Sequence, residues 1–231
     1  LCLACLMSET LGSEHRLQGG VLDSFRGTLG NTRALLSQRG FAALALIMGV
    51  IAVPYFAWIA TVSYIMVDFF QADYLVYSLV YAATSAVSIV APYVYIVLSK
   101  RMGVRQLVVL CIALGALSTA LLAAWGASGP LAFAIAFVPF ALAEGIVRPM
   151  AYVVLLDQPP RLVGAASSFT NFLYNVITAL ATVLATVPWA SYVTGLAVLG
   201  ACSVALIVVL YLWGVRGASL SFNPESDQER D

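Results

Sequence analysis

Charged side chains are scarce in this sequence of 231 residues. They make up 10% of the chain, hydrophobic residues make up 62%, and the mean hydropathy is +0.96. These values lie far outside the range of soluble domains. The Lys and Arg residues fall in short polar stretches between apolar runs, so the sequence offers no basic surface to a nucleic-acid partner. The composition therefore predicts a protein that crosses a lipid bilayer several times.

Histidine and cysteine are also scarce. His15 is the single histidine and lies in a polar stretch, so the apolar runs hold no His-based catalyst or metal site. Cys2, Cys5, Cys111 and Cys202 all lie within apolar sequence, which does not indicate a disulfide framework. The runs also lack a Gly-x-Ser-x-Gly nucleophile turn and paired aspartates. We therefore expect no metal, no cofactor and no enzymatic activity.

Long apolar runs dominate the rest of the chain. Each of six runs is long enough, at ~1.5 Å per residue, to cross the hydrocarbon core of roughly 30 Å as a helix. The runs cover residues 41–67, 74–98, 106–125, 131–155, 162–187 and 192–214. The predicted fold is an all-α membrane protein in which residues 41–214 form a bundle of six transmembrane helices.

Three further segments flank the predicted bundle. Residues 1–7 are apolar without a basic flank, so we interpret them as the end of a preceding transmembrane helix and the chain as a fragment. Residues 8–40 form a polar loop whose apolar residues recur at near-helical spacing, which predicts a helix along the membrane surface. Residues 215–231 form a polar tail that we expect to be disordered.

The basic residues of the loops alternate along the chain. Arg16 to Arg39, Lys100 to Arg105, Arg161 and Arg216 fall in every second loop, and the loops between them contain neither Lys nor Arg. By the positive-inside rule, the basic loops are cytoplasmic. The six crossings then place both ends of this chain in the cytoplasm, in the plasma membrane or a bacterial inner membrane.

The run over residues 131–155 contains two ionisable residues, Glu144 and Arg148. A charge at the centre of a membrane helix costs about 2.5 to 3.5 kcal/mol on insertion scales, so such residues usually face a bundle interior or a wet cavity. Their spacing of four places both on one helix face, where each can be the partner of the other. Pro139 and Pro149 each delete a helix hydrogen bond, which membranes tolerate mainly where protein or water satisfies the backbone.

Arg148 also fits a simpler interpretation. Its long side chain lies within reach of the membrane interface and could snorkel there, and the sequence supports both interpretations equally. Glu144 is short and lies near the middle of the membrane, where it must be paired, protonated or hydrated. We therefore predict a functional role for Glu144.

Two other runs carry aromatic residues suited to a ligand site. Tyr55 and Trp58 follow a central proline in the first run and could face a ligand, although packing against lipid or neighbouring helices explains each of them as well. Tyr81 belongs to an amphipathic stripe of the second run, in steps of three and four residues. We take Tyr55, Trp58 and Tyr81 as candidate residues of a substrate cavity.

The run over residues 162–187 has a continuous polar face that includes Asn171 and Asn175. Two amides on a membrane helix are costly unless they are hydrogen-bonded, so we expect this face to turn toward other helices or toward water. The sequence leaves open whether the asparagines bind helices together or line a cavity.

Three short motifs occur in a set order. Residues 8–11 (SETL) are similar to the PETL-like tag that precedes the central loop of certain transporters, with serine in place of proline. Residues 99–105 (SKRMGVR) resemble a loop of pattern D-R-x-G-R-R, without its leading acid. Residues 159–168 (PPRLVGAASS) resemble a proline turn followed by R-G-x-A-S, with two residues inserted. Together the segments resemble the C-terminal half of a major facilitator superfamily transporter, most closely the drug and proton antiporter branch that includes the Bcr/CflA-type exporters.

This resemblance implies that the six runs are helices seven to twelve, preceded by an N-terminal bundle of six. It implies alternating access around a central cavity that helices seven, eight, ten and eleven border. It also implies proton-coupled export of a lipophilic, cationic small molecule, with aromatic faces as a cation-π surface and Glu144 as the titrating charge. The substrate would lie near Tyr55, Trp58, Tyr81, Glu144, Asn171 and Asn175, and the cytoplasmic gating loop would be Lys100, Arg101, Gly103 and Arg105.

A different class of protein also fits the sequence. A membrane sensor, a scaffold or a decayed half-transporter would have the same six crossings without transport. The coding sequence upstream of Leu1 distinguishes the two, because a transporter of this kind requires six further hydrophobic runs in the same frame.

Overall fold

The computed structural model describes residues 30–217, and all the regular structure in this part of the chain is helical. Residues 30–37 form a helix that ends at Gln38. The elements that follow are α3 (Arg39–Ser63), η2 (Tyr64–Phe69), α4 (Tyr74–Ser99), α5 (Val104–Trp125), η3 (Gly126–Ser128), α6 (Pro130–Leu156), α7 (Pro160–Ala185), α8 (Tyr192–Leu210) and η4 (Tyr211–Val215). The labels η2 and η4 denote π-helical turns that continue α3 and α8, and η3 is a 3-10 turn.

Six of these helical spans are long and apolar enough to cross a membrane. They are Arg39–Phe69, Tyr74–Ser99, Val104–Ser128, Pro130–Leu156, Leu162–Ala185 and Tyr192–Val215. The predicted all-α fold with six membrane helices is confirmed, and the chain is a multi-pass membrane protein. The expectations for residues 1–7, for most of the 8–40 loop and for the tail beyond residue 217 lie outside the described residues.

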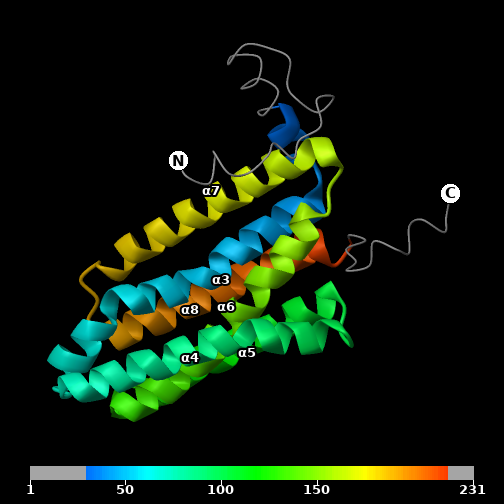
Figure 1. The fold of residues 1–231 in the computed structure, drawn as a ribbon. Helices are drawn as coiled ribbons and strands as arrows, with labels where there is room; N and C mark the ends of the chain where they lie inside the picture. Colours follow the sequence, from blue (N-terminus) through cyan, green and yellow to red (C-terminus); the bar gives the residue numbers. More distant parts are fainter. Residues whose placement is uncertain (1–29, 218–231) are drawn as a thin grey trace, which may run out of the picture.

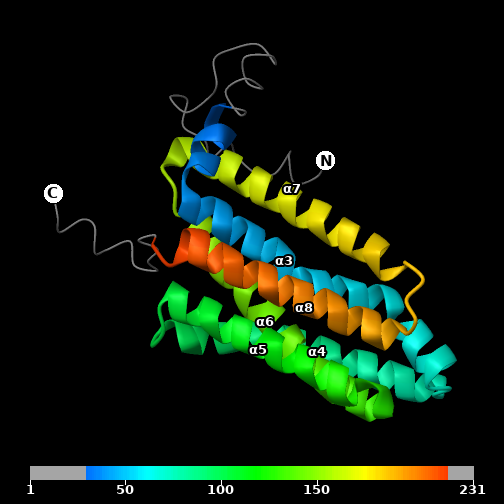
Figure 2. The ribbon, with the colours of Figure 1, turned by 180° about the vertical axis from the view of Figure 1, so that it is seen from behind.

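The helices α3 and α6 form the centre of the bundle. Figures 1 and 2 show α3 between α7 on one side and α8 and α6 on the other, with α4 and α5 packed beyond α6. In an apolar stretch of 18 residues within each membrane span, 72% of the residues are buried for α3 and 61% for α6, against 17% for α4 and 28% for α7. The helices α4 and α7 are therefore edge helices, and each leaves a broad face outside the described bundle.

Small side chains allow α4 and α5 to approach α6 closely. Cys111 and Ser118 on α5 are buried and donate hydrogen bonds to α6, from the Cys111 Sγ to the Ala143 carbonyl (3.7 Å) and from the Ser118 Oγ to the Ala136 carbonyl (2.5 Å). Gly145 on α6 lies so near α4 that a β-carbon there would collide with the Ala91 methyl group. This is the type of contact that drives helix association in lipid, where apolar burial alone cannot.

Replacing Gly145 by alanine is expected to lower the free energy of unfolding by about 1 to 3 kcal/mol, because α4 must move away from α6 to admit the methyl group. Thermal or denaturant unfolding in detergent measures this loss. Gly164→Ala is the matched control, since no atom lies within 4 Å of a β-carbon at Gly164 and alanine is the better helix former. Equal stabilities of the two variants would contradict the close approach of α4 and α6.

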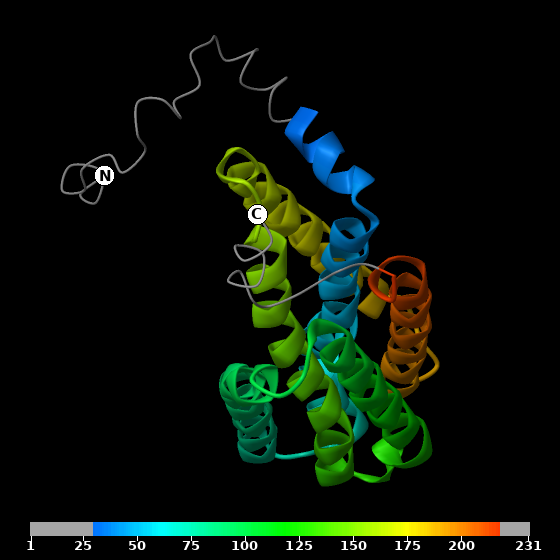
Figure 3. The same cartoon turned by 90° about the vertical axis from the view of Figure 1, so that its right-hand side faces the viewer.

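The connections place the basic residues at one end of the bundle. The α4–α5 loop, the α6–α7 loop and the start of α3 share this end, whereas η2 and η3 lie at the other. Figure 3 shows residues 30–37 (blue) at the same end as the α6–α7 connection (yellow). The turn from η3 into α6 has two identifiable causes. Gly129 has a φ of +154°, which glycine adopts without strain, and Pro130 occupies the first turn of α6, where no amide donor is needed.

Candidate functional site

Glu144 lies in the middle of α6 and its side chain is buried, with 6% of its surface exposed. Of the acidic and basic side chains that the structure describes, it is the only one in the buried class. Helix α6 contacts α3, α4, α5 and α7, so the carboxyl group lies among helices. A carboxyl group in such a place requires hydrogen-bond donors, nearby positive charge or water.

The donor is Tyr174 of α7, whose hydroxyl donates a hydrogen bond to the Glu144 Oε1 at 3.1 Å. Arg148 lies one turn further along α6 and places its guanidinium carbon 5.1 Å from the centre of the same tyrosine ring, a cation-π arrangement. The Arg148 side chain itself is exposed. The sequence placed Glu144 and Arg148 on one helix face, and the structure connects them through Tyr174.

Tyr55 of α3 and Ser88 of α4 line the same site from two other helices. The Ser88 hydroxyl donates to the Tyr55 Oη at 3.0 Å, which joins α3 to α4. A cavity of about 190 Å³ lies among these groups. It is lined by Tyr55, Phe56, Ser88, Pro92, Glu144, Gly145, Arg148, Pro149 and Tyr174. We call it the Glu144 cavity.

The Glu144 cavity has room for several water molecules or one small organic group, and it is smaller than the roughly 300 to 1,000 Å³ of a pocket for a drug-sized ligand. Most of its lining surface is apolar, and the polar side chains in it are those of Tyr55, Ser88, Glu144, Arg148 and Tyr174. Pro92 and Pro149 lack an amide N–H, so the carbonyls four residues earlier, those of Ser88 and Gly145, lose their helix donor. Both residues line the cavity, which can therefore hold water or a small hydrogen-bonding group next to the carboxylate.

Trp58 and Tyr81 lie beside the Glu144 cavity and do not line it. Trp58 is 1% exposed, and its ring stacks on Phe137 (centroids 5.2 Å apart) and on Tyr81 (5.5 Å). The Tyr55 ring stacks on both Trp58 and Phe137 at 6.3 Å. We call Tyr55, Trp58, Phe137 and Tyr81 the aromatic stack. Through Tyr55, the stack runs from the cavity to the half-exposed ring of Tyr81 at the edge of α4.

Asn171 and Asn175 are exposed on α7, outside the Glu144 cavity. The Asn171 Oδ1 accepts a hydrogen bond from the Tyr152 hydroxyl of α6 at 2.6 Å, and each Nδ2 donates to the carbonyl four residues earlier. The buried residues of α7 are mostly small or Thr, such as Ala166, Thr170 and Ala181. Asn171 thus joins α7 to α6, and cavity lining by the two asparagines remains a prediction.

The predicted gating loop lies at the basic end, between α4 and α5. Lys100, Arg101, Gly103 and Arg105 are all exposed there. The Gly103 N–H donates to the Gln106 Oε1 at 3.1 Å and caps the start of α5. This loop lies apart from the Glu144 cavity, which it does not line.

Tyr174 is the residue of this site that the sequence interpretation missed. It lies next to Asn175 but faces α6, because it belongs to the buried side of α7 with Thr170 and Thr178. The sequence does hold a signal for this position, because Tyr174 is four residues from both Thr170 and Thr178 and therefore shares a helix face with them.

Replacing Tyr174 by phenylalanine is expected to lower the free energy of unfolding by about 1 to 3 kcal/mol, because the buried Glu144 carboxyl loses the hydroxyl that donates to it. Unfolding in detergent measures the loss. Tyr152→Phe is the control, since it removes an exposed hydrogen bond between the same two helices. If Tyr152→Phe lowered the free energy of unfolding as much as Tyr174→Phe does, the loss in Tyr174→Phe could not be attributed to the buried Glu144 carboxyl group.

Within residues 30–217, no group of three or more His, Cys, Asp and Glu side chains could hold a metal ion. The arrangement around Glu144 suits a proton or a small polar or cationic group. Comparisons of the chain with protein-family models, with curated proteins and with solved structures find no significant match.

Proposed function

We propose that this chain is part of a transporter that moves small molecules across a membrane by alternating access, and that the Glu144 cavity lies on the path. The proposal depends on one observation, a buried carboxyl group in the middle of a membrane helix, next to a cavity to which four membrane helices contribute. Intramembrane carboxyl groups of this kind mark substrate or proton pathways.

The helices around the cavity support the resemblance to a major facilitator transporter. If α3 to α8 correspond to helices seven to twelve, the cavity is lined by helices seven, eight, ten and eleven, namely α3, α4, α6 and α7. These are the helices that the resemblance assigns to the central cavity. The exposed faces of α4 and α7, with Tyr81, Asn171 and Asn175, would then meet the preceding N-terminal bundle.

The proposed reaction is export of a lipophilic, cationic compound in exchange for protons. The Glu144 cavity alone is too small for such a compound, so the aromatic stack and the proposed N-terminal bundle would supply the remaining surface. Tyr81 offers a half-exposed ring face to a flat cation, and Glu144 would bind a proton or the positive charge of the substrate in turn. The basic ends would face the cytoplasm of a plasma or inner membrane.

An efflux assay tests this function. Cells that express the complete reading frame are loaded with a fluorescent lipophilic cation, and dye loss is followed with and without a proton uncoupler. We expect dye export that the uncoupler abolishes. A reading frame without six hydrophobic runs upstream of Leu1, together with no export of any dye or antibiotic in a broad panel, would favour a sensor or scaffold instead.

A further inference from the structure

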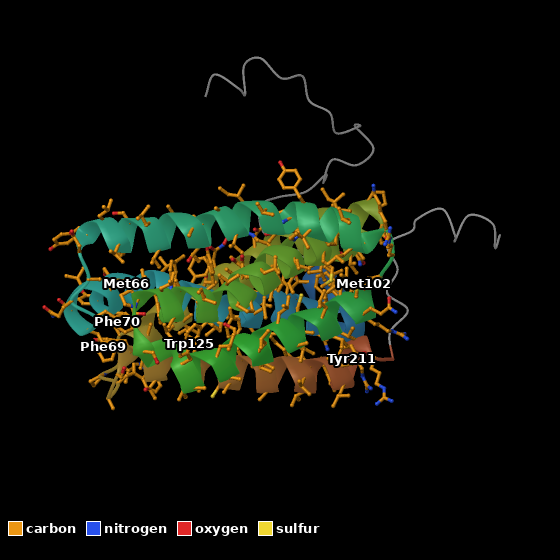
Figure 4. The ribbon with its side chains drawn as sticks, turned by 90° about the horizontal axis from the view of Figure 1, so that it is seen from below. Met66, Phe69, Phe70, Met102, Trp125 and Tyr211 are labelled. Atoms are coloured by element: carbon orange, nitrogen blue, oxygen red, sulfur yellow. The ribbon has the colours of Figure 1, made fainter. Side chains whose placement is uncertain are left out.

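A groove of about 520 Å³ lies at the basic end of the bundle and shares no lining residue with the Glu144 cavity. It runs between the start of α5 and the π-helical turn η4 that ends α8. The side chains that matter for its chemistry are Arg101, Arg105, Gln106, Val109, Ala113 and Tyr211. Figure 4 shows Met102 and Tyr211 at this end, where the nitrogen-bearing side chains gather, and Phe69, Phe70 and Trp125 at the other.

The side chains that line the groove change from basic to apolar along its length. Arg101 and Arg105 are exposed at its mouth, where the α4–α5 loop meets the helix start. Val109 and Ala113 follow Arg105 at intervals of four, so they continue the same face of α5 into the apolar span, and both are exposed. Eight residues of helix cover about 12 Å. A ligand of this groove therefore needs an anionic head and an aliphatic extension of about that length.

The charge of the surrounding surface agrees with such a ligand. At the basic end, the exposed charged residues of the described chain include Arg33, Arg39, Lys100 and Arg216 in addition to the two arginines of the groove, with Asp157 as the acidic one. The opposite end carries Asp68 and Asp73. The basic end thus attracts the anionic headgroups of its leaflet, and an arginine pair can bind one phosphate with several N–H donors.

We propose that the groove binds one anionic glycerophospholipid from the leaflet at the basic end. Its phosphate contacts the guanidinium groups of Arg101 and Arg105, and one acyl chain lies along Val109 and Ala113 against α5. Tyr211 forms the opposite wall at headgroup depth, where aromatic side chains suit the interface. The bound lipid would contact both the α4–α5 loop and the end of α8. This proposal does not depend on the proposed transport function.

The test is a lipid titration of the full 231-residue chain, purified in detergent, with bound lipids counted by native mass spectrometry. We expect one phosphatidylglycerol to bind at least about five-fold more tightly than phosphatidylcholine, since each cation near an anionic headgroup contributes about that factor. The double variant R101Q/R105Q should lose about thirty-fold in phosphatidylglycerol affinity by the same measure. The double variant R33Q/R39Q removes two charges from the same end and should keep the affinity.

A second variant tests the aliphatic half without a change of charge. Ala113→Trp fills the groove beyond the arginines, so phosphatidylglycerol should bind more weakly while inorganic phosphate, added as a competitor, has no effect on either protein. Equal affinity of R101Q/R105Q and R33Q/R39Q would overturn the proposal, as would undiminished binding by Ala113→Trp. Displacement of the lipid by millimolar phosphate would also overturn it, in favour of a simple anion site. If R101Q/R105Q does not fold, as judged by thermal unfolding, Ala113→Trp decides.

Discussion

A Glu144→Gln protein is expected to fold normally and to lose proton-coupled transport. Glutamine keeps the shape and can still accept the hydrogen bond from Tyr174, but it removes the only ionisable group in the buried class among the described acidic and basic side chains. Arg148 is exposed, so this substitution leaves no buried charge without a partner, and we expect the free energy of unfolding to stay the same or to rise. Loss of transport with retained stability separates a functional carboxyl group from a structural one.

The measurement combines dye efflux at several values of external pH with unfolding of the purified protein. Asp157→Asn is the control, because it removes an exposed acid at the end of α6 and should leave both readouts unchanged. Unchanged transport with an unchanged pH profile in Glu144→Gln would remove this residue from the mechanism. A marked fall in stability would instead assign the carboxyl group a role in holding α6 to α7.

Replacing Trp58 by alanine is expected to give the largest loss of stability in this protein, about 3 kcal/mol or more. The Trp58 ring is 1% exposed and is held between Tyr81 and Phe137, so three membrane helices meet on it. Lipid tails are as apolar as the protein interior, so little of this loss comes from transfer of apolar surface. It comes from the dispersion contacts that the ring makes and that a cavity would leave unmade.

Two comparisons sharpen this prediction. Trp213→Ala removes an indole ring that is 51% exposed and should cost far less, which controls for the loss of a tryptophan as such. Trp58→Phe keeps a ring in the stack and removes the indole N–H, which has no hydrogen-bond partner among the described residues. We therefore expect Trp58→Phe to lower the free energy of unfolding much less than Trp58→Ala. Similar unfolding midpoints for Trp58→Ala and Trp213→Ala would mean that the aromatic stack does not hold the bundle together.

The six membrane helices could be predicted because length and hydropathy alone determine them. A run of about twenty apolar residues has few stable alternatives to a crossing helix, since lipid offers no partner to a free backbone amide. The π-helical turns η2 and η4 were not predicted, and they extend the first and last spans to Phe69 and Val215. Nothing in residue composition distinguishes these turns from α-helix.

The site was only partly predictable. Glu144 stood out because burial of a carboxyl group carries a large free-energy cost wherever it occurs in a membrane helix. Tyr174 did not stand out in this way, because it joins the site through the rotation of α7 against α6. That rotation depends on contacts between distant segments, such as Gly49 with Ile177, which a single sequence does not reveal.

The prolines that border the Glu144 cavity have a mechanical consequence. A helix bends most easily where a backbone hydrogen bond is already missing, and both α4 and α6 have such a place at the level of the carboxyl group. Helix α4 continues for seven residues beyond Pro92, to Ser99, and α6 continues for seven residues beyond Pro149, to Leu156. Each of these segments is about 10 Å long. A change of angle at these two prolines would move the basic-side ends of both helices by several ångströms relative to the rest of the bundle.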